Sequence, residues 1–385
     1  MRVKELLQLI PEEQLEVFGV ETKVDNKIKK LSGHIMFQLI LFSMINRKRI
    51  SLRVMEEFLK SSSFRALSNH PEIDGKFNSL SDRIALIRPE YFEKIYYYVY
   101  DTFNKYLNEK DSIHRYDSTM VAVSSKLFTE GMRVGRTAGK DKKQFKFTFG
   151  LHGSLPSYME VFKDQIHLSE DITLNKAILE DKKNRNHIVV FDRGLRAKKA
   201  FEKYSIEEIV FVTRASTNIS HDKIQSKPLQ AKPANATVTI SEDLVIKLKY
   251  DRPVPKNRGD FRLIKATIDQ TGEEIFFLSN SQELSAYEIA MIYKSRWEIE
   301  IFFKFLKQEL NIEHLVSRDP NGIRVMMYMT LITSILIIAF RKLNKLTSYK
   351  IAKLRFALEL ENSVIAQIVL LCGGDLSKFN ELFDP

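Results

Sequence analysis

Alternating strand and helix patterns over residues 113–216 constrain the fold of this chain more than any other feature. Three β-branched or aromatic runs with turn residues between them come first, IHRYDSTMVAVSS, FKFTFGLHG and YMEVFKDQIHL. A helical stretch, the apolar run HIVVFD, the helical LRAKKAFEKY and the strand-like IEEIVFVTRA follow. Strands that alternate with helices in this way predict an α/β core, in which helices pack on a sheet.

The segments around this core have different patterns and predict five parts. Residues 1–110 have helical periodicity and predict a separate helical domain, and residues 111–216 form the first part of the core. Residues 217–282 hold strand-like runs with no helical pattern between them, which predicts an inserted β subdomain. Residues 283–318 return to helix and complete the core, and residues 319–385 predict a C-terminal helical region.

The longest apolar stretch, Val325–Phe340, is shorter than the ~18 residues that a membrane-spanning helix needs, so we expect a buried core helix. The N-terminus has acidic residues where a signal peptide needs an apolar run. The single cysteine, Cys372, excludes an internal disulfide and a cysteine-rich zinc site. It also fits a reducing compartment. These features predict a cytoplasmic protein with no membrane partner.

The charge balance favours a polyanionic partner. The chain has 60 Lys and Arg against 49 Asp and Glu, a formal net charge of +11. Lys and Arg that meet phosphates release condensed counterions, so such a surplus is typical of nucleic-acid-binding proteins. A basic soluble protein with no nucleic-acid role has the same composition, and charge alone does not exclude it.

Residues 285–310 predict one helix with two neighbouring stripes, at about 100° per residue. The first stripe is apolar and predicts the core face: Ile292, Ile299, Phe302, Phe303, Leu306 and Leu310. The second holds one carboxylate among a phenol and three cations: Tyr293, Arg296, Glu300, Lys304 and Lys307. Glu298 lies well away from that stripe. A solvated face with ordinary pairs such as Glu300–Lys304 has the same pattern, so the helix alone does not indicate a site.

Two aspartates in the predicted core point to phosphodiester chemistry. Asp117 interrupts the strand HRYDSTMVAV, and Asp192 ends HIVVFD before Arg193 and Gly194. A carboxylate on an apolar strand is costly to bury without a partner. Phosphodiester cleavage uses clustered carboxylates that hold divalent cations. A turn-capping role for Asp192 stays open.

The spacing Tyr293-x2-Arg296-x3-Glu300-x6-Lys307 resembles the Y-R-E-K signature of DDE transposases of bacterial insertion sequences, specifically insertion-sequence family four. The rest of the chain agrees in order, with Asp117 in D-S-T, Asp192 in D-R-G and a β-rich segment before the signature helix. The resemblance covers residues 110–310. Leu195 departs from it, because many members have an aromatic residue there.

The resemblance implies a ribonuclease-H-like catalytic core with an inserted β subdomain, and a DNA-binding role for the helical domain of residues 1–110. It implies Asp117, Asp192 and Glu300 as the catalytic, metal-binding triad for two Mg²⁺ or Mn²⁺ ions. The activity implied is cut-and-paste transposition, in which a dimer cuts double-stranded DNA at terminal inverted repeats and joins the freed ends to target DNA. A stand-alone nuclease and a non-catalytic DNA-binding relic are the alternatives.

The resemblance also implies DNA contacts for the residues around Glu300. Tyr293, Arg296, Lys304 and Lys307 would handle phosphates, and Trp297 would stack on an extruded base, although a packing role for Trp297 stays open. Residues 131–146, rich in Gly and Lys, predict either a DNA-gripping loop or a solvated hairpin. The eight histidines show no zinc-type spacing, so the sequence predicts no zinc site.

Overall fold

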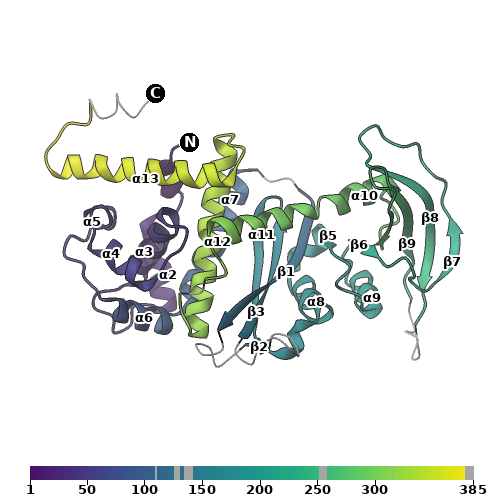
Figure 1. The fold of residues 1–385 in the computed structure, drawn as a ribbon, viewed down its shortest axis with the longest axis horizontal. Helices are drawn as coiled ribbons and strands as arrows, with labels where there is room; N and C mark the ends of the chain where they lie inside the picture. Colours follow the sequence, from purple (N-terminus) through teal and green to yellow (C-terminus); the bar gives the residue numbers. More distant parts are fainter. Residues whose placement is uncertain (109–110, 125–130, 134–141, 251–257, 315, 378–385) are drawn as a thin grey trace. The chain divides into compact units, whose positions relative to one another are not determined.

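The computed structural model describes residues 1–108, 111–124, 131–133, 142–250, 258–314 and 316–377 (Figure 1). The chain divides into two compact units. The helical unit comprises Met1–Asn108, Val123–Thr129 and Lys304–Pro385, and the sheet unit comprises Glu109–Ala122 and Glu130–Phe303. The N-terminal and C-terminal helical segments, expected as separate regions, therefore share one unit.

The helical unit is built from nine helices in the described residues. In chain order they are α1 (Val3–Gln8), α2 (Glu12–Thr22), α3 (Gly33–Asn46), α4 (Leu52–Lys60), α5 (Ser62–Ser68), α6 (Phe77–Leu86), α7 (Pro89–Tyr106), α12 (Pro320–Leu343) and α13 (Tyr349–Leu371). Ser32, Ser51 and Ser61 cap α3, α4 and α5 by accepting hydrogen bonds from backbone N–H groups of the first turn. Pro89 opens α7, where the missing N–H costs nothing.

The apolar stretch expected as a core helix lies in α12, which is buried along most of its length. α12 packs against α3, α6, α7 and α13. Its length and hydropathy would suit a membrane span, but 94% of its most apolar window is buried inside the protein. Asp319 caps it by accepting a hydrogen bond from the Asn321 backbone N–H. The helix is therefore the centre of the helical unit's core, as its apolar length predicts.

The sheet unit contains one sheet of ten strands in the order β2-β3-β1-β5-β6-β10-β9-β8-β7, with β4 paired to β3. Its strands are β1 (Ile113–Ser124), β2 (Met132–Arg133), β3 (Lys142–His152), β4 (Leu155–Phe162), β5 (Ile188–Phe191), β6 (Phe211–Ala215), β7 (His221–Ser226), β8 (Val238–Leu248), β9 (Phe261–Ile268) and β10 (Glu274–Ser279). β1, β5 and β6 are parallel, and β7 to β10 are antiparallel. The α/β core expected from the sequence is confirmed.

Helices cover both faces of this sheet. α8 (Glu170–Glu180) and α9 (Lys198–Ile206) pack on one face, and α10 (Ala286–Lys294) packs on the other. Two short 3-10 helices, η1 (Gln165–Leu168) and η2 (Lys182–Asn186), flank α8. β5 shows the alternation that this layering requires, because Val189 and Phe191 belong to the α8–α9 core and Val190 to the α10 core.

The strands expected as an inserted β subdomain extend the core sheet. β10 pairs with β6 along four residues, so β7 to β10 continue the same hydrogen-bonded ladder. The runs TVTISED and LVIKLKY together form the single strand β8, with a register shift at Ile240–Glu242. Residues 251–257 lie outside the described part of this segment.

The single helix expected over residues 285–310 is two helices, which corrects the expected stripe. α10 ends at Lys294 and α11 (Trp297–Glu309) begins three residues later. Ser285 and Glu288 form a capping box at the start of α10. The Ser295 hydroxyl donates to the Ile292 carbonyl at 2.7 Å, a bond that competes with regular helix. Tyr293 and Glu300 therefore lie on different helices, and Arg296 lies in the break between them.

Candidate active site

Asp117 and Asp192 are adjacent because of the parallel pairing of β1 with β5. The pairing runs from Ile113 opposite Ile188 to Tyr116 opposite Phe191. Asp117 and Asp192 are the next residues on the two strands. The apolar residues of β5 are buried on both faces of the sheet, and Asp192 directly follows their end. The two carboxylates are close enough for Asp192 to raise the pKa of Asp117.

The Asp117 carboxyl is in a buried and crowded electrostatic environment. Its side chain is 25% exposed. Burial, as the largest cause, and the carboxylates of Glu170 and Asp192 raise its pKa to about 6, against the opposing effects of the Ser118 backbone N–H and Arg296. The Ser118 N–H donates to Asp117 Oδ1 at 2.8 Å. When the pKa of a carboxyl is raised in this way, an added positive charge favours its ionised form.

Tyr293, at the end of α10, holds the second aspartate. Its hydroxyl donates to Asp192 Oδ1 at 3.0 Å. Burial and the adjacent Asp192 raise the pKa of Tyr293 to about 12, so the phenol remains a hydrogen-bond donor over the neutral range. The Tyr293 ring packs against Phe277 of β10, with ring centroids 5.4 Å apart.

Arg296 connects the third carboxylate to the first. Its Nη2 donates to Glu300 Oε1 at 2.6 Å, and its Nη1 lies 3.9 Å from Asp117 Oδ2. Burial opposes the charge of Arg296, but the Glu300 hydrogen bond and the nearby Tyr293 and Asp192 raise its pKa overall. The guanidinium also lies 5.7 Å from the centre of the Tyr293 ring. Asp117, Asp192, Glu300, Tyr293 and Arg296 thus form one connected network.

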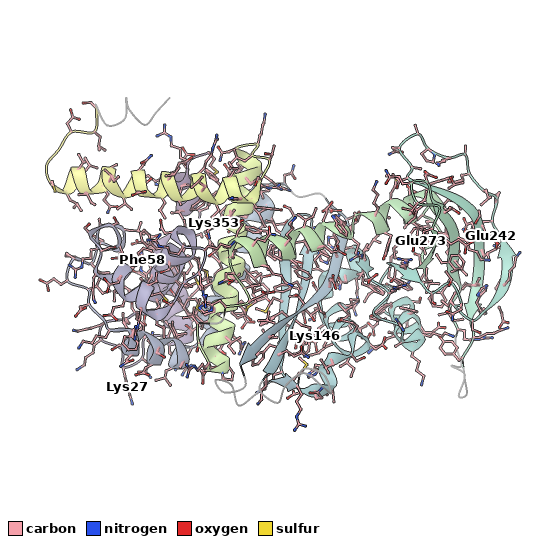
Figure 2. The ribbon with its side chains drawn as sticks, viewed as in Figure 1. Lys27, Phe58, Lys146, Glu242, Glu273 and Lys353 are labelled. Carbon is pink, nitrogen blue, oxygen red and sulfur yellow. The ribbon has the colours of Figure 1, made fainter. Side chains whose placement is uncertain are left out.

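A further carboxylate and a buried lysine (Figure 2) lie beside this network, and the sequence analysis did not identify them. Glu170, the first residue of α8, accepts a hydrogen bond from the Ser118 hydroxyl at 3.1 Å and pairs with Lys146 Nζ at 2.8 Å. Lys146, on β3, is 1% exposed and also donates to the Leu168 carbonyl at 3.1 Å. A lysine within the apolar run FKFTF was the available signal, because a buried ammonium needs a partner.

Glu298 and Trp297, at the start of α11, lie outside the network of carboxylates described above. Glu298, the competitor of Glu300, pairs with Arg115 Nη2 at 3.4 Å, and the same guanidinium is anchored to the Ser295 carbonyl and Asp111. Trp297 is 60% exposed, so the packing role considered for it does not account for most of its surface. The start of α11 is held by Phe302 and Phe303, which contact Phe149 of β3.

The two lysines of the expected stripe belong to the helical unit. Lys304 is exposed, and Lys307 Nζ lies 3.6 Å from Glu313. Tyr293 and Arg296 therefore contact the carboxylates. Lys304 and Lys307 belong to the other unit. Of the predicted basic loop at residues 131–146, residues 134–141 lie outside the described residues.

The chemistry of the donors fits divalent cations. Asp117, Asp192 and Glu300 supply hard carboxylate oxygens, which Mg²⁺ and similar ions prefer. Burial, as the largest cause, raises the pKa of Asp117 despite Arg296, so an added positive charge would favour its ionised form. Among the described residues, three histidines form a group whose possible metal-ligand atoms all lie within 4.8 Å of one another. Asp117, Asp192 and Glu300 do not form such a group.

Comparison with known proteins identifies the fold family of this site. Residues 113–336, more than half of the chain, match the family model described as the transposase DDE domain. A protein of Sinorhizobium fredii assigned as the transposase y4zB is 26% identical over 161 residues, which cover 41% of this chain and 44% of that protein. A protein of Synechocystis sp. assigned as the transposase for insertion sequence element IS4SA is 24% identical over 222 residues, 57% of this chain and 58% of that protein.

Two more similarities were found. The Escherichia coli transposase for insertion sequence element IS421 is 28% identical over 120 residues, 31% of this chain and 32% of that protein. A cryo-electron microscopy structure of a piggyBac transposase synaptic complex with hairpin DNA has a TM-score of 0.48 and 11% identity, and covers 96% of this chain and 82% of that chain. The matched stretches span about half, or less, of the length of the curated relatives.

Proposed function

Because this chain belongs to the family of transposases with a DDE domain, we propose that it performs cut-and-paste transposition of a bacterial insertion sequence. The family makes it a metal-dependent enzyme that cuts DNA and transfers strands. The finer proposal is that one active site cuts at terminal inverted repeats and then joins the freed ends to target DNA. A ribonuclease-H-like core is supported by the parallel strands β1, β5 and β6 and by α8, α9 and α10 on the two faces.

Asp117, Asp192 and Glu300 are the proposed catalytic and metal-binding residues. The observation that carries this assignment is the network in which Arg296 joins Glu300 to Asp117 and Tyr293 holds Asp192. These contacts bring together three carboxylates from two strand ends and a helix. Two Mg²⁺ or Mn²⁺ ions held there would stabilise the attacking and leaving oxygens of phosphodiester cleavage and strand transfer.

The other residues of the network would orient these carboxylates and the DNA. Tyr293 fixes one oxygen of Asp192 and leaves its second oxygen available to a ligand. Arg296 would offset part of the negative charge of Glu300 and Asp117 before DNA is bound. Its Nε is buried and has no acceptor among the described residues, so it can donate to a phosphate oxygen that enters the site. Lys304 and Lys307 would contact the backbone phosphates further along the DNA, and the exposed Trp297 would stack on a base.

The proposed partners are double-stranded DNA and a second copy of the chain. The positive net charge of +11 supports binding to the DNA backbone at the inverted repeats and at the target. Both ends of the element must be cut and joined to the target DNA. This favours a homodimer with one active site for each end. The proposed location is the bacterial cytoplasm, in association with the nucleoid.

Purified variants test this function with a labelled element end and a plasmid target. We expect Asp117→Asn, Asp192→Asn and Glu300→Gln each to abolish Mg²⁺-dependent cutting and joining while end binding in a gel-shift assay remains. Glu298→Gln is the matched control on the same helix, and it should cut at close to the wild-type rate. Cutting by the Glu300→Gln protein at the wild-type rate would exclude Glu300 from the triad. Cutting without joining would indicate the stand-alone nuclease instead.

A further inference from the structure

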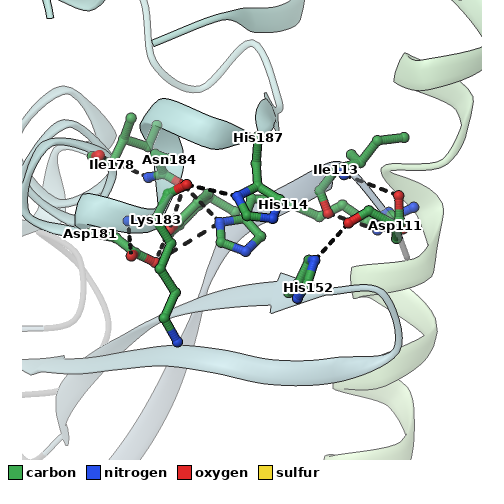
Figure 3. A network of polar contacts seen from close by, with 11 residues as sticks. Asp111, Ile113, His114, His152, Ile178, Asp181, Lys183, Asn184 and His187 are labelled. Carbon is green, nitrogen blue, oxygen red and sulfur yellow. Dashed lines mark hydrogen bonds and ion pairs between the residues drawn. The ribbon is translucent and has the colours of Figure 1, made fainter. Parts of the chain in front are cut away.

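Three histidines meet at the ends of three neighbouring strands (Figure 3). His114 is the second residue of β1, His187 directly precedes β5, and His152 ends β3. The register Ile113 opposite Ile188 places the first two side by side. His187 and Asp192 lie on opposite ends of β5, separated by about 17 Å of extended chain, so the histidines do not belong to the DDE site.

The three rings are in mutual contact. His114 and His187 have ring centroids 4.4 Å apart, and His152 lies 4.8 Å from His114 and 4.7 Å from His187. One ligand nitrogen from each ring lies within 4.8 Å of those of the other two. Such a group has no short-range sequence signature, because its members are 38 and 35 residues apart. Sequence spacing therefore predicted no zinc site where the sheet brings three imidazoles together.

Each ring uses one nitrogen to donate to an oxygen, which fixes its tautomer. His114 Nδ1 lies 2.7 Å from Asn184 Oδ1, and the orientation of that amide is set because its Nδ2 donates to the Ile178 carbonyl at 2.8 Å. His187 Nδ1 lies 2.7 Å from the Lys183 carbonyl, and His152 Nε2 lies 2.6 Å from the Asp111 carbonyl. In a neutral imidazole the second nitrogen then carries the lone pair.

In these tautomers the lone pairs lie on His114 Nε2, His152 Nδ1 and His187 Nε2. Metal-binding histidines typically donate their other N–H to a carbonyl or carboxylate, which orients the ring and raises its basicity. All three rings already have such an acceptor. The set therefore includes both the ligands and the groups that orient them.

Of the three histidines, His114 would be stabilised most by a bound ion. Its side chain is fully buried, and its Nε2 has no hydrogen-bond partner among the described residues. A buried polar atom without a partner is unfavourable, and a bound ion would satisfy it. Burial, as the largest cause, lowers the pKa of His114.

We propose that His114, His152 and His187 bind one divalent transition-metal ion of the zinc type, with solvent as a fourth ligand. Imidazole nitrogens suit Zn²⁺, Co²⁺ and Ni²⁺, whereas Mg²⁺ prefers oxygen ligands, so this ion would differ from those of the carboxylate site. Zn–N bonds of about 2.0–2.1 Å in a tetrahedron place the nitrogens about 3.3 Å apart. Closing from 4.8 Å to that distance takes a movement of less than about 1 Å for each ring, together with a rotation that ends the parallel stacking of His114 on His187.

The ion would fasten the starts of β1 and β5 and the end of β3 to one another. β1 and β5 are the strands that carry Asp117 and precede Asp192, so the site would stabilise the framework of the active site without taking part in cleavage. The alternative is a cluster of neutral histidines that pack on one another and bind no ion.

Binding is tested with Co²⁺, whose visible absorption reports its ligands, in the full-length Asp117→Asn/Asp192→Asn protein after chelation and dialysis. This background removes the carboxylates that would otherwise bind the probe. We expect one equivalent of Co²⁺ with tetrahedral d–d bands, displacement by Zn²⁺, and a higher melting temperature. His187→Asn on the same background should weaken binding at least ~100-fold, which is more than the loss of an orienting group costs.

His221→Asn is the matched control, since His221 is also half-buried in the sheet unit and has its Nδ1 2.8 Å from a local carbonyl, that of Ile219. It should leave Co²⁺ binding unchanged. If His187→Asn fails to fold, X-ray absorption at the zinc edge of the zinc-loaded Asp117→Asn/Asp192→Asn protein counts imidazole ligands directly. Absence of Co²⁺ binding in the Asp117→Asn/Asp192→Asn protein, equal affinity in His187→Asn, or fewer than three imidazoles would overturn the proposal and leave a packing cluster.

Discussion

Arg296 donates a hydrogen bond of 2.6 Å to Glu300, and its other terminal nitrogen lies 3.9 Å from Asp117. The guanidinium can reach both carboxylates because it is forked and because Arg296 lies in the break between α10 and α11. A lysine ammonium in its place would be a single point charge. The geometry of the carboxylates therefore depends on the shape of this side chain as well as on its charge.

The first prediction separates shape from charge at this position. Arg296→Lys keeps the charge but cannot hold both carboxylates, and a small misplacement of catalytic groups costs up to about 100-fold in rate. We expect its rate of end cleavage to fall at least ~10-fold while the salt dependence of DNA binding stays as in the wild type. Arg296→Gln should reduce both the rate of end cleavage and the salt dependence of DNA binding. A Lys variant that cleaves at the wild-type rate would show that charge alone matters. Single-turnover cleavage and titrations at several salt concentrations measure the two effects.

The second prediction concerns the hydrogen bond from Tyr293 to Asp192. Tyr293→Phe removes only the hydroxyl and leaves the ring packed on Phe277. We expect the free energy of unfolding to change by about 1 kcal/mol or less, as for a typical hydrogen bond. The apparent affinity for Mn²⁺ in the cleavage assay should fall, because the oxygens of Asp192 are no longer held in place. An unchanged Mn²⁺ dependence would reduce Tyr293 to a packing residue.

The third prediction tests the buried ion pair that the sequence did not suggest. Glu170→Gln leaves Lys146, 1% exposed, with only the Leu168 carbonyl and a neutral amide beside it. We expect the variant to be destabilised by about 2 kcal/mol, less than for a fully buried pair because Glu170 is partly exposed. Replacing both residues, with Lys146→Met added, should recover part of that loss. Urea unfolding of the wild type, Glu170→Gln, Lys146→Met and the double variant measures it, and additive losses would contradict a coupled pair.

The sequence predicted the parts of this protein that depend on local pattern. Asp117 and Asp192 were predicted as candidates because the first interrupts and the second ends an apolar strand, and the parallel register of β1 with β5 makes them neighbours. The buried helix α12 was likewise evident from its length and composition. In each of these cases the signal lies within about a dozen residues, where period and residue type are informative.

Features that depend on long-range pairing could not be predicted. The regular periodicity of residues 285–310 gave no sign of the break at Ser295, which tertiary packing and a side-chain hydrogen bond to the backbone produce. The pairing of β10 with β6, which extends the core sheet, involves residues more than 60 positions apart. Glu170 and the three histidines were missed for the same reason, because only the folded sheet brings them to Lys146 and to one another.

The last prediction is a pH dependence in the helical unit. Lys353 in α13 is buried, and its ammonium donates to the carbonyls of Glu309 and Arg47 at 2.6 and 3.2 Å. Burial, as the largest cause, lowers its pKa from 10.5 to about 8. Between these two values the unfolded chain binds more protons than the folded protein, so the stability contributed by Lys353 rises with pH. It is fully present above pH 10.5 and is lost as the pH falls through 8.

A comparison with Lys353→Met isolates this contribution, because other titrating groups cancel. From pH 7.5 to pH 10 the free energy of unfolding of the wild type should rise relative to that of the variant, by up to about 3 kcal/mol for the full difference in pKa. Lys350→Met, on the exposed side of the same helix, is the control and should follow the wild type at both pH values. Urea unfolding followed by helical circular dichroism measures the three proteins. A constant difference between wild type and Lys353→Met would mean that the two carbonyls keep Lys353 protonated across this range, with a pKa close to that of the unfolded chain.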